Sequence, residues 1–306
     1  MSLEFDTRFE TPHDQPVEVA AGVRRLTANN PGPFTFQGTN SYVIGRDNLA
    51  VIDPGPEDDA HFDALLAAIG GRPVSHIFVS HTHRDHSPLA ARLREKTGAI
   101  ICAEGPHRPA RPLRIGEINP LDASADLEFV PDMKLEDGSV LDGGDWAIRT
   151  ILTPGHTANH AVFALEGTGT LFSADHVMGW STSIVAPPDG AMTDYMASLD
   201  RLLARHDKVF LPGHGGPVVK PHKFIRGLKA HRKMRERSIV ERLKGGDRTI
   251  AEMVTQIYRD TDPRLHGAAA LSVLAHLEDL VARGVVAADG DPSIDANYTL
   301  VEDSAR

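Results

Sequence analysis

The stretch Ser80-His81-Thr82-His83-Arg84-Asp85-His86 holds, within six residues, four side chains that can bind a metal ion. The apolar, β-branched run 74–79 precedes it, so we expect a buried strand to end there and to release the four side chains into a loop. A helix is expected after the loop, over 88–96, with Ser87 as its N-cap and Pro88 at its first position. The candidate ligands would then lie between a strand and a helix, where α/β folds place active sites.

The two pairs of candidate ligands are expected to face two different points. His81 and His83 stand two residues apart in an extended segment and can point to the same side. Asp85 and His86 come from the turn that follows and can face a second point nearby. The alternative is a histidine-rich surface loop, which the tight spacing and the similar residues downstream disfavour.

Three later segments repeat the pattern of a buried strand, a sharp turn and one metal-binding side chain. Apolar runs beginning at Trp146, Thr170 and Val209 are expected to be the strands. The side chains that follow these runs are His156, Asp175 and His214. One such segment alone would usually be an ordinary turn, whereas four in succession predict a shared metal site.

The order and the types of these residues resemble those of the metallo-β-lactamase superfamily, in the branch whose two-metal site has five histidines and two aspartates. The ligand sets implied by the resemblance are His81, His83 and His156 for one metal, Asp85, His86 and His214 for the other, and Asp175 as the bridge. Imidazole and carboxylate ligands without a thiolate suit Zn²⁺, and Mn²⁺ and Fe are the alternatives.

The expected chemistry is hydrolysis. Two divalent cations about 3.5–4 Å apart lower the pKa of a shared water and stabilise both the attacking and the leaving oxygen. We therefore expect a hydroxide bridging two metals to attack an ester, thioester, lactone or similar carbonyl. Asp85 is expected to be catalytic as well as a ligand, because it can accept or steer the proton of the nucleophile. A non-catalytic binding protein is an alternative that the complete set of ligand residues disfavours.

A narrower resemblance, to the β-lactamase-like protein 2 group, covers almost the whole chain. It rests on 30–42, on 172–203 and on Leu265-His266-Gly267-Ala268-Ala269 ahead of an apolar helix. The resemblance implies an α/β fold, a four-layer αββα sandwich with a small C-terminal winged-helix-like domain. The best-known member of the group resembles an endoribonuclease, and related sequences include polyketide thioesterases. Single-stranded RNA is therefore the alternative to a small ester or thioester as substrate.

Two domains are expected, a catalytic one over 1–219 and a helical, winged-helix-like one over 220–306. The length of 306 residues alone suggests about two domains. The expected helices are 60–69 and 194–205 in the first domain, then one ending at Gly245, one capped by Thr249 and one over 263–283, with wing strands at 284–286 and 298–300.

Composition and the lack of long apolar runs indicate where in the cell the protein works. Charged residues make up 24% of the chain and hydrophobic ones 41%, as in an ordinary soluble protein. The single cysteine, Cys102, excludes an internal disulfide and is expected in a buried strand. The N-terminus is polar, and no run approaches the roughly 18 apolar residues of a membrane span. We therefore expect a cytoplasmic enzyme without membrane contact.

The charge pattern points both toward and away from nucleic acid. A net charge of −10 disfavours strong nonspecific binding, yet residues 220–248 hold eleven Lys or Arg against three acids. A cluster there could follow a phosphate backbone; the alternative is a solvated helix face partly paired with the acidic catalytic domain. Packing on that domain and formation of a homodimer are the other roles left open for the tail. The basic cluster consists of Arg226, Lys229, Arg232, Lys233, Arg235 and Arg237.

Other segments are expected near the site without binding metal. The proline-rich stretch 106–120 predicts an irregular loop that shapes substrate access. His160 is expected behind the ligands or on the surface, and His176 is expected to turn away because neighbouring strand side chains alternate faces. Asn40 and Ser41 are expected to close a strand turn.

Overall fold

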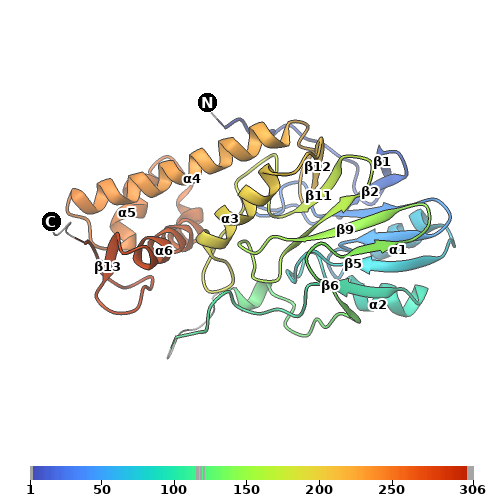
Figure 1. Ribbon diagram of the computed structural model, residues 1–306, viewed down its shortest axis with the longest axis horizontal. Coiled ribbons are helices and arrows are strands. Elements are labelled where there is room, and N and C mark those ends of the chain that lie inside the picture. The colour runs from blue at the N-terminus through green and yellow to red at the C-terminus, as the bar shows by residue number, and fades with distance from the viewer. Residues whose placement is uncertain (1–2, 115–116, 118, 120, 302–306) are drawn as a thin grey trace.

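Two β-sheets lie at the centre of the larger part of the molecule (Figure 1). This computed structural model describes residues 3–114, 117, 119 and 121–301. The first sheet has seven strands in sequence order, antiparallel up to β4 and parallel from β4 to β7. Its strands are β1 Val17–Ala20, β2 Val23–Thr27, β3 Asn40–Ile44, β4 Leu49–Ile52, β5 Val74–Phe78, β6 Ile100–Ala103 and β7 Met133–Lys134.

The second sheet has five strands in the order β12-β11-β10-β9-β8. All its neighbours are antiparallel except β11 and β12, which are parallel. The strands expected to begin near Trp146, Thr170 and Val209 are thereby confirmed. The bounds are β8 Val140–Asp142, β9 Ala147–Leu152, β10 Ala161–Leu165, β11 Thr170–Ala174 and β12 Val209–Pro212.

An aromatic layer packs the two sheets against each other. Phe78 of the first sheet meets Phe163 of the second with ring centroids 5.2 Å apart, and Tyr42 meets Phe172 at 5.0 Å. Burial of one such side chain contributes about 1.5–3 kcal/mol. The layer therefore fixes the sheets, and the loops at their ends, relative to one another. Cys102 is buried in the same layer, on β6, as expected.

Helices cover the outer face of each sheet and complete the four layers. Helices α1 (Asp59–Ile69) and α2 (Leu89–Thr97) pack on the first sheet, and α3 (Met192–Leu203) packs on the second. The predicted four-layer αββα sandwich is confirmed. The prediction that Ser87 caps α2 was wrong, because its hydroxyl donates to Asp126 Oδ2 at 2.8 Å and the helix begins at Leu89.

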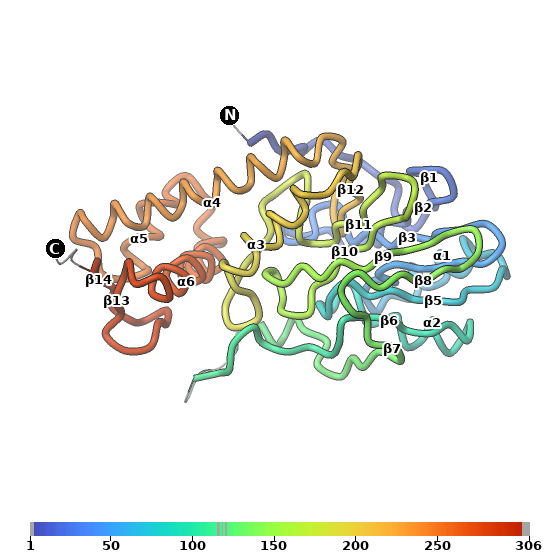
Figure 2. The backbone as a smooth tube through the Cα atoms, in the orientation of Figure 1, coloured from blue at the N-terminus to red at the C-terminus, as the bar shows by residue number. Residues whose placement is uncertain are grey.

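The long helix α4 (Pro221–Lys244) joins the sandwich to a smaller helical unit (Figure 1). Its first half packs against α3 through Ile225 and Leu228, and its second half packs in the smaller unit through Ile239 and Leu243. The division of the chain at 219/220 therefore stays a prediction. The N-terminal segment lies along the start of α4 (Figure 2), where the rings of Phe5 and Phe224 are 6.2 Å apart.

The smaller unit has the expected helices and wing. Thr249 and Glu252 form a reciprocal capping box at the start of its first helix, as the prediction of Thr249 as N-cap requires. The two wing strands pair in antiparallel fashion. The elements are α5 Ile250–Ile257, the short 3₁₀ helix η2 Pro263–Leu265, α6 His266–Ala282, β13 Val286–Ala288 and β14 Tyr298–Leu300.

One segment reaches the length of a membrane span. The helix formed by η2 and α6 together, Pro263–Ala282, is long and apolar enough to cross a membrane, judged by length and composition alone. By that criterion, the expectation that no segment has the length and apolar character of a membrane span was wrong. Core helices of water-soluble proteins pass the same test. Here Val273, Leu274 and Leu277 pack in the interior of the smaller unit.

Candidate metal centre

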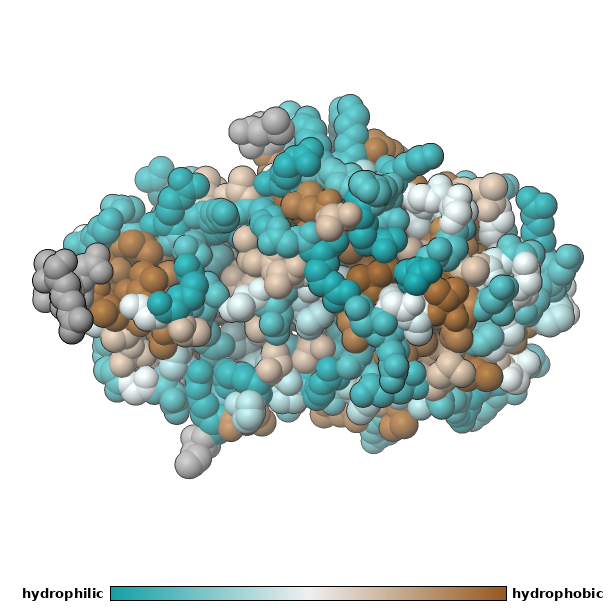
Figure 3. All heavy atoms as spheres, viewed as in Figure 1, coloured by the Kyte–Doolittle hydropathy of each residue, from teal (hydrophilic) through white to brown (hydrophobic). Residues whose placement is uncertain are grey.

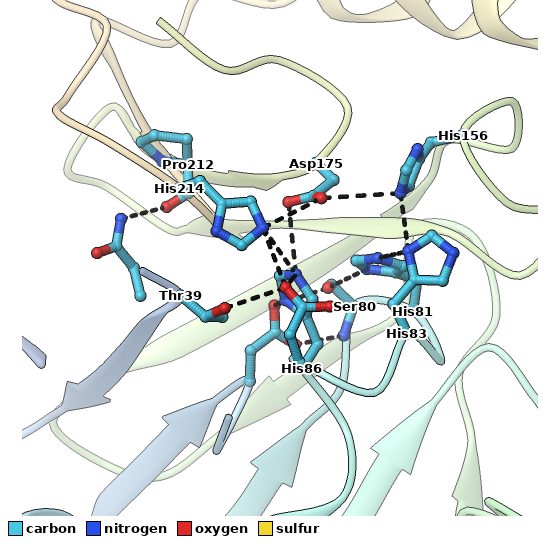
Figure 4. A network of polar contacts seen from close by, with 12 residues as sticks. Thr39, Ser80, His81, His83, His86, His156, Asp175, Pro212 and His214 are labelled. Atoms are coloured by element: carbon cyan, nitrogen blue, oxygen red, sulfur yellow. Dashed lines mark hydrogen bonds and ion pairs between the residues drawn. The ribbon is translucent and has the colours of Figure 1, made fainter. Parts of the chain in front are cut away.

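Seven side chains from four strand ends converge on one point between the two sheets (Figure 4). The stretch 80–86 follows β5, and the later segments follow β9, β11 and β12, as predicted. All seven residues singled out in the sequence are brought together. They are His81, His83, Asp85, His86, His156, Asp175 and His214.

The first group consists of three imidazoles whose ring nitrogens face one another. His83 Nδ1 lies 2.9 Å from His81 Nε2 and 3.1 Å from His156 Nε2. Burial holds the pKa of His81 well below its usual value and lowers the pKa of His83 to about 3. These rings are therefore neutral at pH 7, and their lone pairs can bind a cation.

The second group combines two imidazoles with a carboxylate. Asp85 Oδ2 lies 3.2 Å from both His86 Nε2 and His214 Nε2. Burial would lower the pKa of His214, but the charges of Asp175 and Asp85 outweigh it and raise the pKa to about 10. Burial would raise the pKa of Asp85, but His86 and His214 hold it well below its usual value. Such a site exchanges its protons for a cation as the cation binds.

Asp175 lies between the two groups. Its Oδ2 is 3.7 Å from His156 Nε2 and 3.3 Å from His214 Nε2, and its Oδ1 is 3.5 Å from His86 Nε2. Oδ1 is buried and has no hydrogen-bond partner among the described residues. A buried carboxylate oxygen without a partner is costly, and a cation at this point would satisfy it. The donor set therefore fits divalent metal binding, with Asp175 among the residues that would hold the metal.

Asp53, at the end of β4, supports one histidine in each group, and sequence reasoning missed it. Its Oδ1 accepts from the backbone N–H of Ser80 at 2.7 Å. Its Oδ2 accepts from Ser80 Oγ at 2.7 Å and from His86 Nδ1 at 3.0 Å. Ser80 Oγ in turn lies 3.0 Å from His81 Nδ1. The available signal was Ile52-Asp53-Pro54-Gly55, a strand followed by a Pro-Gly turn, as at His156 and His214.

Backbone carbonyls orient two of the other three imidazoles, those of His156 and His214. Nδ1 of His156 lies 2.6 Å from the carbonyl oxygen of Ile184, and Nδ1 of His214 lies 3.2 Å from that of Gly38. Donation from Nδ1 leaves the Nε2 lone pair pointing into the centre. Gly213 is required by space, because a Cβ there would lie 2.4 Å from Asp175 Oδ1.

Residues at the start of β3 form hydrogen bonds to a candidate ligand and to the loop that carries another. Sequence reasoning missed this contribution as well. Thr39 Oγ1 donates to Asp85 Oδ2 at 3.0 Å (Figure 4). Asn40 Nδ2 donates to the carbonyl oxygens of Pro212 and Gly215, both at 3.0 Å, and so ties down the loop that carries His214. The prediction that Asn40 and Ser41 close a turn was wrong, because both lie within β3.

Two further histidines lie behind the ligands. The ring of His160 is 5.1 Å from the ring of His81, and its Nδ1 lies 2.9 Å from Thr153 Oγ1. The ring of His176 packs 4.6 Å from that of Tyr195 and turns away from the candidate ligands, as strand alternation predicts. Neither residue belongs to a potential metal-binding group among the described residues.

A cavity of about 350 Å³ opens beside the candidate ligands. Five of the seven line it, and the remaining wall is mostly apolar. Its largest apolar members are Phe34, Leu121, Met178, Trp180, Ile184 and Leu271. No Lys or Arg is among the described residues of this wall. Larger hollows, such as the groove of about 1060 Å³ along α4, are not lined by the candidate ligands.

The predicted loop over 106–120 lies beside this cavity. Its described residues form no helix or strand, and Leu121 and Ser124, just beyond it, line the cavity. Ile115, Gly116, Ile118 and Pro120 lie outside the described residues. The expectation that the stretch shapes substrate access agrees with this position.

The basic cluster on α4 divides into packed and exposed members. Arg232 is buried, donates to the carbonyl oxygen of Ser183 and lies 5.2 Å from the centroid of the Tyr195 ring. Arg235 lies 4.6 Å from the centroid of Tyr258, and Lys229 pairs with Asp200 of α3. The remaining three, Arg226, Lys233 and Arg237, are exposed and have no acidic partner among the described residues. This agrees with a helix face partly paired with the sandwich; Figure 3 shows mostly hydrophilic side chains along α4.

Family comparisons cover both parts of the chain. Residues 34–214 match the metallo-beta-lactamase superfamily, and residues 249–295 match the beta-lactamase associated winged helix domain. The chain is 28% identical over 279 residues to the beta-lactamase-like protein 2 homolog of Drosophila melanogaster, which covers 87% of this chain and 90% of that protein.

Other similar proteins include thioesterases and solved structures. An atrochrysone carboxyl ACP thioesterase of a Cryptosporiopsis species is 27% identical over 240 residues, which cover 76% of this chain and 67% of that protein. The crystal structure of a beta-lactamase domain protein from Burkholderia ambifaria superposes with a TM-score of 0.78 at 23% identity, covering 98% of this chain and 97% of the other.

Proposed function

The chain belongs to the metallo-β-lactamase superfamily, and from that premise we propose that it is a two-metal hydrolase of thioesters or esters with an apolar acyl group. The observation that carries this proposal is the cavity beside the candidate ligands, whose wall is mostly apolar and, among described residues, free of Lys and Arg. An acyl chain gains free energy from such a wall. A phosphodiester backbone would instead call for cationic contacts.

The metal ligands are proposed residue by residue. Imidazole and carboxylate donors favour Zn²⁺, with Mn²⁺ and Fe as alternatives. Two divalent cations would supply polarisation of the substrate carbonyl and a lowered pKa for water. One cation would be held by His81, His83 and His156, the other by Asp85, His86 and His214, with Asp175 shared between them.

Asp85 is proposed to orient the attacking water. Its side chain borders the cavity and is 25% exposed, so a substrate or a water molecule can reach it. His86 and His214 keep it ionised at neutral pH, since its pKa lies well below the usual range. Thr39 already donates to Oδ2, which leaves Oδ1, without a hydrogen bond to the described residues, to accept one from water and so to orient it.

The names of relatives favour a thioester within this class. Two of them, from Cryptosporiopsis and from Paecilomyces divaricatus, are named as thioesterases that act on an acyl carrier protein. A thioester also suits the cavity, because the acyl chain can enter it while the thiol part stays outside.

An endoribonuclease is the second candidate. The match to a winged-helix domain and the exposed cations Arg226, Lys233 and Arg237 favour it. However, no member of the basic cluster lines the cavity. RNA binding through these cations would weaken steeply with salt, whereas turnover of an uncharged thioester would change little.

The test compares the two substrates with one set of protein samples. Metal-loaded protein is given octanoyl-N-acetylcysteamine or labelled single-stranded RNA at about 50 and about 200 mM salt. Asp85→Ala and a chelator are the negative controls, and Asp59→Asn changes an exposed carboxylate that pairs with Arg92 and belongs to neither the ligand groups nor the cavity wall among the described residues. We expect thioester hydrolysis at both salt concentrations, lost only in the negative controls. The proposal would be overturned if the protein cleaved RNA, if this cleavage were lost in Asp85→Ala and with the chelator, and if no thioester were hydrolysed.

A further inference from the structure

The first turns of α6 form part of the cavity wall, although α6 belongs to the smaller helical unit. Ala268 and Leu271 both line the cavity. They stand three residues apart, so they share one face of the helix. Five of the candidate ligands line the same cavity from the sandwich. The cavity is therefore closed by two parts of the chain that are distant in sequence.

Ion pairs and hydrogen bonds hold α6 in this position. Glu278 accepts from Arg111 at 2.8 Å and from Arg114 at 3.0 Å, and both arginines belong to the proline-rich loop beside the cavity. These side chains are about one-fifth exposed, so solvent screens them only partly. The next residue of α6, Asp279, accepts at Oδ1 from Thr193 Oγ1 at 2.7 Å. The wall is thus fastened to the sandwich at two points.

Another part of the cavity wall is equally constrained. The ring of Trp180 stacks on that of Phe36 with centroids 4.8 Å apart and an interplanar angle of 10°. Its other neighbour is Gly215, where a Cβ would lie 2.8 Å from Trp180 Cδ1. The stack on Phe36 and the close approach to the backbone of Gly215 leave the ring of Trp180 little room to move. A volume of about 350 Å³ is also near the lower end for ligand sites.

We propose that Ala268 and Leu271 set the largest acyl group that the site accepts, so that the winged-helix unit acts as the end wall of an acyl pocket. This inference rests on the proposed function. Each methylene that lengthens the acyl chain and still fits the pocket should raise kcat/KM about fourfold. The first methylene that no longer fits should lower kcat/KM by a similar factor. Removing three carbon atoms from Leu271 should therefore move the limit by about two or three methylenes.

The first experiment is a chain-length series of saturated acyl-N-acetylcysteamine thioesters, from acetyl to dodecanoyl. We expect kcat/KM to rise with length and then to fall at a definite limit. Leu271→Ala should move that limit to longer chains, and Ala268→Leu should move it to shorter ones. Val281→Ala is the matched control, because Val281 lies on the same helix, is partly buried against the core of the smaller unit and is not among the residues that line the cavity. Turnover by the wild type with the same limit in all four proteins would overturn the inference.

The second experiment measures binding without turnover. The chain has two tryptophans, Trp146 and Trp180, and Trp180 is the one that lines this cavity. In a Trp146→Phe background, binding of linear carboxylates is followed by the fluorescence of Trp180. The longest carboxylate that binds should match the chain-length limit of the thioester series, and Leu271→Ala should shift that limit to longer chains. Titration calorimetry without the Trp146 change is the check if that background folds poorly.

The two experiments separate the inference from the function on which it rests. A shifted carboxylate limit without hydrolysis of any thioester would support the end wall and reject the proposed reaction. Thioester hydrolysis with an unshifted limit would support the reaction and reject the end wall. Neither hydrolysis nor a shifted carboxylate limit would reject both.

Discussion

The loop at 80–86 and helix α4 are both dense in ionisable residues, yet the structure uses them in opposite ways. In the loop, every metal-binding side chain reaches the same centre. On α4, three neighbouring cations have three different surroundings: Lys229 pairs with Asp200, Arg232 is buried and Lys233 is exposed. The directions of side chains at a strand end follow from local geometry. The surroundings of a helix residue depend on which element packs against that face.

Loss of a carboxylate ligand should be the largest effect. We expect Asp175→Ala and Asp85→Ala each to lower kcat/KM at least about 10³-fold, because metal catalysis supplies several kcal/mol and about 1.4 kcal/mol corresponds to tenfold. Metal content, measured by atomic emission, should fall in both variants. Asp59→Asn, which changes a carboxylate that is 86% exposed, should behave as the wild type. Full activity of either alanine variant would show that the cluster is not the reaction centre.

The second-largest effect should be a difference in stability between variants of two adjacent cations on α4. Arg232→Ala should lower the free energy of unfolding by about 2–4 kcal/mol, because it removes a charged hydrogen bond to Ser183 and a contact with Tyr195. Lys233→Ala should change it by less than about 0.5 kcal/mol, since that side chain is exposed. Urea unfolding of the two variants measures the difference. Equal effects would mean that the contrast along α4 is unimportant for stability.

The support by Asp53 predicts an effect on metal affinity. Asp53→Asn places an amide N–H group where a carboxylate oxygen accepts from Ser80 Oγ and His86 Nδ1. We expect a loss of about 10–100-fold in affinity for both metals, measured by chelator competition. Asp126→Asn is the control, because Asp126 accepts from Ser87 and forms no hydrogen bond or ion pair with a candidate ligand among the described residues. Loss at one metal alone would limit the role of Asp53 to a single group.

The smallest effect should be a pH dependence of the free energy of unfolding that arises from a buried histidine on α6. His276 is buried, and both ring nitrogens lack a hydrogen-bond partner among the described residues. Burial, with the charges of Arg232, His231, Arg283 and Arg235, lowers its pKa to about 3. The unfolded chain therefore takes up the proton first, and stability falls as the pH drops below about 6.5. At pH 5.5 the loss should be about 1.4 kcal/mol.

The variant His276→Leu tests this assignment. It should remove that share of the pH dependence between pH 7 and 5.5, as measured by urea unfolding. The metal-centre histidines are unchanged in this comparison, so the difference between the variant and the wild type isolates His276. Parallel pH profiles of the two proteins would assign the acid sensitivity elsewhere.

Supporting residues were harder to predict than ligands. Asp53 follows the same strand-and-turn pattern as the ligands, but its role depends on the parallel pairing of β4 with β5, which brings Ser80 and His86 to it. Asn40 acts on the loop that carries His214, and that contact joins the first sheet to the second. A pattern in one segment carries no information about such pairings.

By itself, the sequence determined the two-part organisation, the strand ends and all seven candidate ligands, because buried strands and Pro-Gly turns set side-chain directions within a few residues. Only the tertiary structure decided how Asp53 supports both groups, which cations of α4 are exposed, and that Leu271 of α6 lines the same cavity as five of the candidate ligands. Those features depend on which surfaces meet when sheets and helices pack, and packing joins segments that are far apart in the chain.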